Sequence, residues 1–105
     1  MTQPPWDVRP ASTAVERDWR RLRRAHPELT QKALLYWAHD PWAPNDLVIH
    51  PRADLALRQW GSGRNKKSYE QRGFIIGGTT AYFIVVDNTV IITAVIQFLI
   101  PDNYV

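Results

Sequence analysis

The chain has no cysteine among its 105 residues, which excludes a disulfide framework and a metal site built on thiolates. Its N-terminus also lacks the basic segment followed by an apolar segment that a secretory signal requires. We therefore expect a cytoplasmic protein. A chain of this length is most simply a single domain, and we assign residues 1–105 to it.

Apolar runs long enough to cross a membrane are absent too. The stretch from Phe74 to Ile100 is rich in Ile, Val and Phe, but GGTT, Asp87-Asn88 and Gln97 divide it. Each piece falls far short of the ~20 apolar residues of a spanning helix. These pieces predict the buried strands of a sheet, and no membrane partner is expected.

Basic residues are missing from the last third of the chain. All 13 Lys and Arg residues lie at or before Arg72, and only Asp87 and Asp102 carry a charge after it. With a net charge of +3, this asymmetry suggests an anionic partner such as nucleic acid or an acidic protein segment. It also arises whenever a chain places its buried strands last.

A short strand and a helix are predicted first. Residues 6–9 alternate apolar and polar side chains before Pro10, which is typical of an edge strand. Thr13, with Ser12 as the alternative, is placed to cap a helix. The apolar residues of this helix recur with helical spacing, at Val15, Trp19 and Leu22. The opposite face is basic and carries Arg17, Arg20, Arg21 and Arg24.

A second helix should begin at Pro27 and end before Pro41, because proline suits the first helical position and disfavours helix in the residue before it. The short link between the helices predicts an antiparallel helical hairpin. Residues 68–76, 80–87 and 89–98 indicate three successive strands joined by tight turns. The predicted fold class is α+β: an N-terminal strand and a helical hairpin packed on a mostly antiparallel, twisted sheet of about four strands.

Metal and nucleophile chemistry find no support in the sequence. The histidines, His26, His39 and His50, have none of the spacings of a metal-binding motif. No serine follows the strand-Gly-x-Ser-x-Gly-helix pattern of a nucleophile elbow. We expect no cofactor.

A cluster of basic and aromatic residues remains as the candidate site. Such a surface can stack bases on aromatic rings and hold phosphates with cations. Lys, Arg and Tyr can also supply the proton acceptor, the charge donors and the acid that RNA cleavage by 2′-hydroxyl attack needs. The members are Arg52, Arg58, Arg64, Lys66, Lys67, Tyr69, Arg72 and Tyr82. The alternative is that Lys66-Lys67 flank a solvated turn, where lysine discourages edge-to-edge pairing.

Three segments together resemble the RelE/ParE superfamily of bacterial type II toxin-antitoxin systems, and in particular its actinobacterial-type members. They are DWRRLRRAHPELTQKALLYWAHDP as the helical hairpin, HPRADLALRQW where the family has a His/Arg-Leu-Lys/Arg-Gly segment, and YEQRGFIIGGTTAYFIVVDNTVIITAV where it has a Tyr-Glu strand, a glycine turn and two further strands. The resemblance covers roughly residues 6–96. It implies a RelE-like fold and a toxin that a cognate antitoxin protein wraps and neutralises.

The resemblance also implies two modes of action. RelE-like members cut mRNA in the ribosome with a cluster of Lys, Arg and Tyr, without a metal, whereas ParE-like members block DNA gyrase. Carried over by position, Arg52 matches the basic residue of the His/Arg-Leu-Lys/Arg-Gly segment, Tyr82 or Phe83 falls near the strand aromatic, and Lys66 and Lys67 precede the Tyr-Glu strand. We therefore expect an mRNA endonuclease with Arg52, Lys66, Lys67, Arg72 and Tyr82 as catalytic residues, and Arg58, Arg64 and Tyr69 as RNA-binding residues.

The chain departs from the family at three positions. Thr79-Thr80-Ala81 follows the glycine turn where the family usually has an arginine, Ala53 replaces a glycine, and the C-terminal FLIPDNYV has no basic residue. Either Arg58, Arg64 or Arg72 supplies the missing charge, or the protein is a non-catalytic binder: a gyrase inhibitor or an inactive toxin homologue. A structural or oligomerising module is the third alternative, with Trp42, Trp60 and the segment VIQFLIP as its partner surface. A homodimer formed through the C-terminal strand is also compatible with the sequence.

Overall fold

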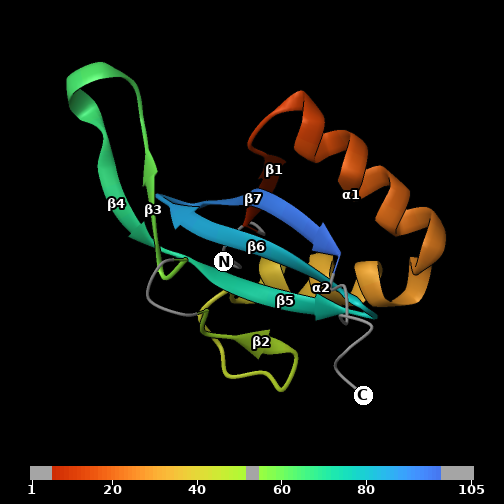
Figure 1. Cartoon of the computed structure of the whole chain (residues 1–105). Coiled ribbons are helices and arrows are strands. Elements are labelled where there is room, and N and C mark those ends of the chain that lie inside the picture. Colours follow the sequence, from red (N-terminus) through yellow and green to blue (C-terminus); the bar gives the residue numbers. More distant parts are fainter. Residues whose placement is uncertain (1–5, 52–54, 98–105) are drawn as a thin grey trace, which may run out of the picture.

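The computed structural model describes residues 6–51 and 55–97. In these ranges two helices and seven strands follow one another in the order β1-α1-α2-β2-β3-β4-β5-β6-β7, with a 3₁₀ turn, η1, between β3 and β4 (Figure 1). The architecture is α+β, as the sequence predicts. Among the described residues, neither helix has the length and apolar character of a membrane span.

Helix α1 (Thr13–Ala25) is held by a polar cap and an apolar stripe. Ser12, the alternative cap, is the residue used: its hydroxyl accepts a hydrogen bond from the Val15 amide at 3.2 Å. Trp19 and Leu22 are buried, as their spacing predicts. The arginines occupy the remaining circumference and are exposed.

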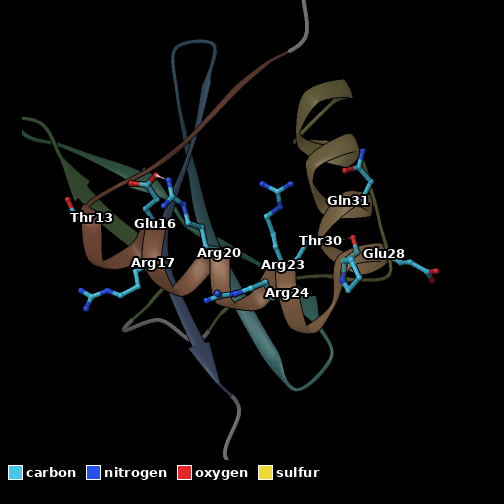
Figure 2. Close-up of a pocket in the computed structure, with 10 residues that line it drawn as sticks. Thr13, Glu16, Arg17, Arg20, Arg23, Arg24, Glu28, Thr30 and Gln31 are labelled. Carbon is cyan, nitrogen blue, oxygen red and sulfur yellow. Dashed lines mark hydrogen bonds and ion pairs between the residues drawn. The ribbon is translucent and has the colours of Figure 1, made fainter.

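Helix α2 (Pro27–His39) begins at its proline, and the residue before Pro41, Asp40, caps its C-terminus in an extended conformation. A single residue, His26, separates it from α1. The two helices diverge from this residue instead of lying side by side as a closed antiparallel pair (Figures 1 and 2). The helical hairpin is therefore more open than the short link predicts.

The main sheet has five strands in the order β1-β7-β6-β5-β2, one more than the sequence predicts. Their bounds are β1 Asp7–Pro10, β2 Val48–Ile49, β5 Arg72–Ile76, β6 Thr79–Val86 and β7 Thr89–Gln97. The edge strand β1 runs parallel to β7, and the other pairs are antiparallel. The tight turns at residues 77–78 and 87–88 are confirmed, and Gly77 and Asp87 supply the positive φ angles they need.

A second, two-stranded sheet projects from the main one. It consists of β3 (Leu57–Trp60), η1 (Gly63–Asn65) and β4 (Lys67–Glu70), and we call residues 57–70 the arm. The prediction of one continuous strand over residues 68–76 was wrong, because the strand divides at Gln71. On one side of Gln71 it pairs with β3, and on the other with β6 and β2. Figure 1 shows the arm extending well away from the helices.

One core joins the helices to the sheet. Trp37 is fully buried at its centre, and its ring centroid lies 5.5 Å from that of Trp19 and 5.3 Å from that of Phe83. Phe74 on β5 completes the aromatic cluster. The predicted burial of Trp19 and Trp37 is thus confirmed.

The sheet has a second side, directed away from the helices. Because strand side chains alternate, Gly73 and Tyr82 lie on this side, opposite to Phe74 and Phe83 of the core. A bulge after Tyr82 leaves Thr93 as an extra residue between the pairs Tyr82–Ala94 and Phe83–Ile92. We call this side of the sheet the open face.

Candidate nucleic-acid interface

One side of the arm combines two cations with two aromatic rings. Arg58 is paired with Tyr69, and Trp60 with Lys67, in neighbouring positions of the β3–β4 ladder. Paired residues of an antiparallel ladder point to the same side, and positions two apart do so as well. Arg58, Trp60, Lys67 and Tyr69 therefore share one side, which we call the arm face.

The arm face has the chemistry of a single-strand nucleic-acid platform. Bases stack on aromatic rings, and neighbouring guanidinium and ammonium groups hold the phosphates between them. Trp60 and Tyr69 are half-buried, while Arg58 and Lys67 are exposed. The sequence alone leaves Trp60 open between a partner or dimer contact and local packing, and its pairing with Lys67 is the signal that adds it to the site.

The tip of the arm extends the positive surface. Arg64 lies in η1 and Lys66 directly follows it, and both side chains are exposed. Gly61 and Gly63 have φ angles of 126° and 58° that let the chain reverse here. Within the described residues, no carboxylate lies within 4.0 Å of either cation.

The arm face adjoins the open face of the main sheet at Gln71. Gln71 lies between β4 and β5, outside both ladders, and it and Gly73 are buried. Gly73 is paired with Tyr82, which brings this tyrosine to the same side. Arg58, Lys67 and Tyr69 thus share the arm face, with Arg64 and Lys66 at the tip of the arm, while Tyr82 lies on the open face beyond the buried Gln71 and Gly73.

Arg72 does not join this surface. It is in register with the core residue Phe83 and lies on the helix side of the sheet, with only 18% of its side chain exposed. There its guanidinium makes two 3.3 Å contacts to Glu70 and lies 4.9 Å from the centre of the Trp42 ring. Its position indicates a packing role, away from Tyr82. Arg52, the remaining predicted catalytic residue, lies outside the described residues.

The surroundings of Arg72 include a constrained tyrosine. The Tyr36 hydroxyl lies 2.6 Å from the carbonyl oxygen of Ala43 and 3.0 Å from that of Pro41, so its one proton is shared between two acceptors. Burial raises the pKa of Tyr36 above its ordinary value of 10.0, and the positive charge of Arg72 acts in the opposite direction. This hydroxyl fastens the loop after α2 to the helix.

A buried polar link anchors the base of the arm. The Gln71 side chain accepts a hydrogen bond from the Thr93 hydroxyl at 2.5 Å and donates one to the Leu55 carbonyl oxygen at 2.8 Å. Gln71 and Thr93 are 5% and 4% exposed. The bulge in β7 supplies the hydroxyl, so the arm is tied across β6 to the far strand.

A second basic surface lies between the helices, as Figure 2 shows. It is an open groove of about 1230 Å³ lined by Thr13, Glu16, Arg17, Arg20, Arg23, Arg24, Pro27, Glu28, Thr30 and Gln31. In the described parts of the chain, no group of three or more His, Asp and Glu side chains is arranged to hold a metal ion.

Comparison of the chain with protein-family models, curated proteins and solved structures finds no match.

Proposed function

We propose that this protein is the toxin of a toxin-antitoxin pair of the RelE/ParE type, and that it cuts mRNA bound to ribosomes. The observation that carries the proposal is the arm face, with Arg58, Lys67 and Tyr69 on one side of the β3–β4 ladder and Arg64 and Lys66 at the tip, beside the open face that carries Tyr82. The target places the protein in the cytoplasm. A cognate antitoxin is its partner.

The order of elements supports the same proposal. An N-terminal strand, two helices on one face of a sheet, and a final antiparallel meander follow one another as the three resembling segments predict. Fold alone does not imply function, because one architecture serves many activities. The residues of the site must therefore distinguish one activity from another.

The proposed site has the groups that metal-free RNA cleavage needs. Attack of a 2′-hydroxyl on the adjacent phosphorus forms a 2′,3′-cyclic phosphate and breaks the bond to the 5′-oxygen. Lys67 or Tyr82 accepts the proton of the 2′-hydroxyl, and Tyr69 returns a proton to the departing oxygen. Arg58, with Arg52 and Lys66, stabilises the charge of the pentavalent phosphate.

A second candidate is a non-catalytic toxin that binds DNA gyrase, or an inactive toxin homologue. It is favoured by the helix-side position of Arg72, since the strand after the glycine turn carries Thr79-Thr80-Ala81 and adds no cation to the open face. Loss of one preorganised charge donor typically costs about 10²–10³ in rate. An arm that only binds would serve such a protein.

The test combines growth with two biochemical assays. Induced expression should arrest growth, and purified protein added to programmed ribosomes should cut the mRNA, as mapped by primer extension. Lys67→Ala should reduce cutting at least 10-fold, whereas Lys32→Ala, the same change on the exposed side of α2, should leave it unchanged. Growth arrest without cutting, together with inhibition of gyrase supercoiling, would establish the second candidate. No arrest and neither activity would refute both.

A further inference from the structure

The groove between α1 and α2 is too large and too open for a small-molecule site. Its volume of about 1230 Å³ exceeds the range of roughly 300–1,000 Å³ typical of small-ligand pockets. It exists because α2 diverges from α1 at His26 (Figure 2). An extended ligand is needed to fill it.

Arginine dominates the α1 side of this groove. Arg17, Arg20 and Arg24 recur at i, i+3 and i+7 and form a stripe about 10 Å long, given the helical rise of ~1.5 Å per residue. In Figure 2 the Arg23 side chain projects from α1 into the space beside α2. Every basic residue of α1 is arginine, and none is lysine. The planar guanidinium binds phosphate oxygens in pairs, whereas lysine presents a single charge.

Three of these four arginines are available to a ligand. Arg20 is paired with Glu16 at 2.7 Å. Arg17, Arg23 and Arg24 are exposed, and no carboxylate of the described residues lies within 4.0 Å of them. Arg21 faces a different hollow, beside Asp18 and His26, and so lies outside the stripe.

The residues that line the groove favour one of two kinds of anionic ligand, an acidic peptide or a nucleic-acid backbone. A peptide helix or strand docks by burying apolar anchors as well as by charge, whereas the lining residues named above are mainly arginines and other polar residues, with Pro27 as their one apolar member. A nucleic-acid backbone needs only cations and hydrogen-bond donors, and Gln31 and Thr13 add such donors beside the arginines. We propose that the α1–α2 groove binds the phosphodiester backbone of a nucleic-acid strand. It is a second site, separate from the arm face, and it does not depend on the proposed cleavage activity.

Fluorescence anisotropy with a labelled single-stranded oligouridylate tests this proposal without ribosomes. The groove variant is Arg17→Gln/Arg23→Gln/Arg24→Gln. The control is Arg9→Gln/Arg21→Gln/Lys32→Gln, which removes the same charge outside the groove and the arm. At about 100 mM salt the groove variant should bind at least 10-fold more weakly than the parent. Its plot of log K against log salt should be shallower by about 2, since each phosphate contact to a single strand contributes ~0.7.

The control variant should keep the parental slope of log K against log salt and lose no more than about 3-fold in affinity. Its three lost charges lie outside the groove and act on the RNA only through long-range electrostatics. Duplex RNA and DNA, assayed in parallel, show which source of phosphodiester the groove prefers. A groove variant that behaves like the control, or displacement of the RNA by an acidic peptide at equal concentration, would overturn the proposal. NMR shifts of the arginine Nε signals of the unmodified protein on RNA addition provide a readout that needs no variant, and unchanged signals for Arg17, Arg23 and Arg24 would also overturn it.

Discussion

Single residues explain how the helices meet the sheet. A side chain at Gly77 would place its Cβ 2.8 Å from the imidazole of His26, the residue that separates the helices, and Gly77 has a φ of 62°. Glycine is therefore required twice, for conformation and for space. The neighbouring Gly78 has neither constraint, because a Cβ there meets nothing within 4 Å.

Substitution at this turn should distinguish the two glycines. Gly77→Ala should lower the free energy of unfolding by about 1–3 kcal/mol, the sum of left-handed strain and the contact with His26. Gly78→Ala should change it by no more than about 0.5 kcal/mol. Urea unfolding at neutral pH measures both. Equal losses for the two variants would show that His26 does not pack on the turn.

Tyr36 gives a prediction that depends on pH. Tyr36→Phe removes the proton shared by two carbonyl oxygens and should cost about 1–2 kcal/mol at pH 7. Since burial raises the pKa of Tyr36 in the folded state, this stabilisation is complete below pH 10 and is lost as pH rises through the raised pKa. The stability difference between parent and variant should therefore shrink above pH 10 in urea titrations. A difference that grew with pH would contradict the assignment.

At the scale of elements, the arm depends on its attachment to β7. Gln71 sits where β4 becomes β5, and Thr93 reaches it from the bulge across β6. Both groups are buried, so each needs the other as a hydrogen-bond partner. The link fixes the base of the arm to the main sheet.

Removing one partner of this link should be costly even without a change in volume. Thr93→Val has nearly the same shape but leaves the Gln71 oxygen buried without a donor, and it should destabilise the protein by about 1–3 kcal/mol. Thr93→Ser keeps the hydroxyl and loses one methyl group, at about 0.8 kcal/mol. Denaturant unfolding compares the two. A valine variant more stable than the serine variant would show that the hydrogen bond contributes little.

The elements also show where sequence patterns suffice. Apolar spacing, Ser or Thr before a helix, and Gly77-Gly78 and Asp87-Asn88 between apolar runs are local signals, and they predicted both helices and the last two hairpins. No local signal predicts the division of the expected strand 68–76. The division depends on distant partners, because residues before Gln71 pair with β3 and residues after it pair with β6 and β2. Arg72 could have been placed from its alternation with Phe74 and Ile76, which assigns it to the core side. Assigning Trp60 to the site required the register between β3 and β4, which pairs it with Lys67. The loop that contains η1 has no two-residue turn pattern from which this register could be predicted.

At the scale of the whole molecule, both helices and the central strands share one core. Trp19 of α1 and Trp37 of α2 contact each other, and Trp37 contacts Phe74 of β5 and Phe83 of β6. No layer can leave this cluster without exposing a large aromatic surface, which favours cooperative unfolding. The arm contributes no member to this core cluster.

Different spectroscopic probes should therefore detect one and the same unfolding transition. Tryptophan fluorescence reports on the buried Trp19 and Trp37 and on the half-buried Trp6 and Trp60, whereas Trp42 is 44% exposed already in the folded state. Far-UV circular dichroism reports on the helices and strands. The two urea curves should share one midpoint, and Trp42→Phe should leave the free energy of unfolding within about 0.5 kcal/mol of the parent value. If fluorescence changed at lower urea than dichroism, the helices would separate from the sheet before the secondary structure is lost, and the α1–α2 groove would have to be treated as part of an independently moving layer.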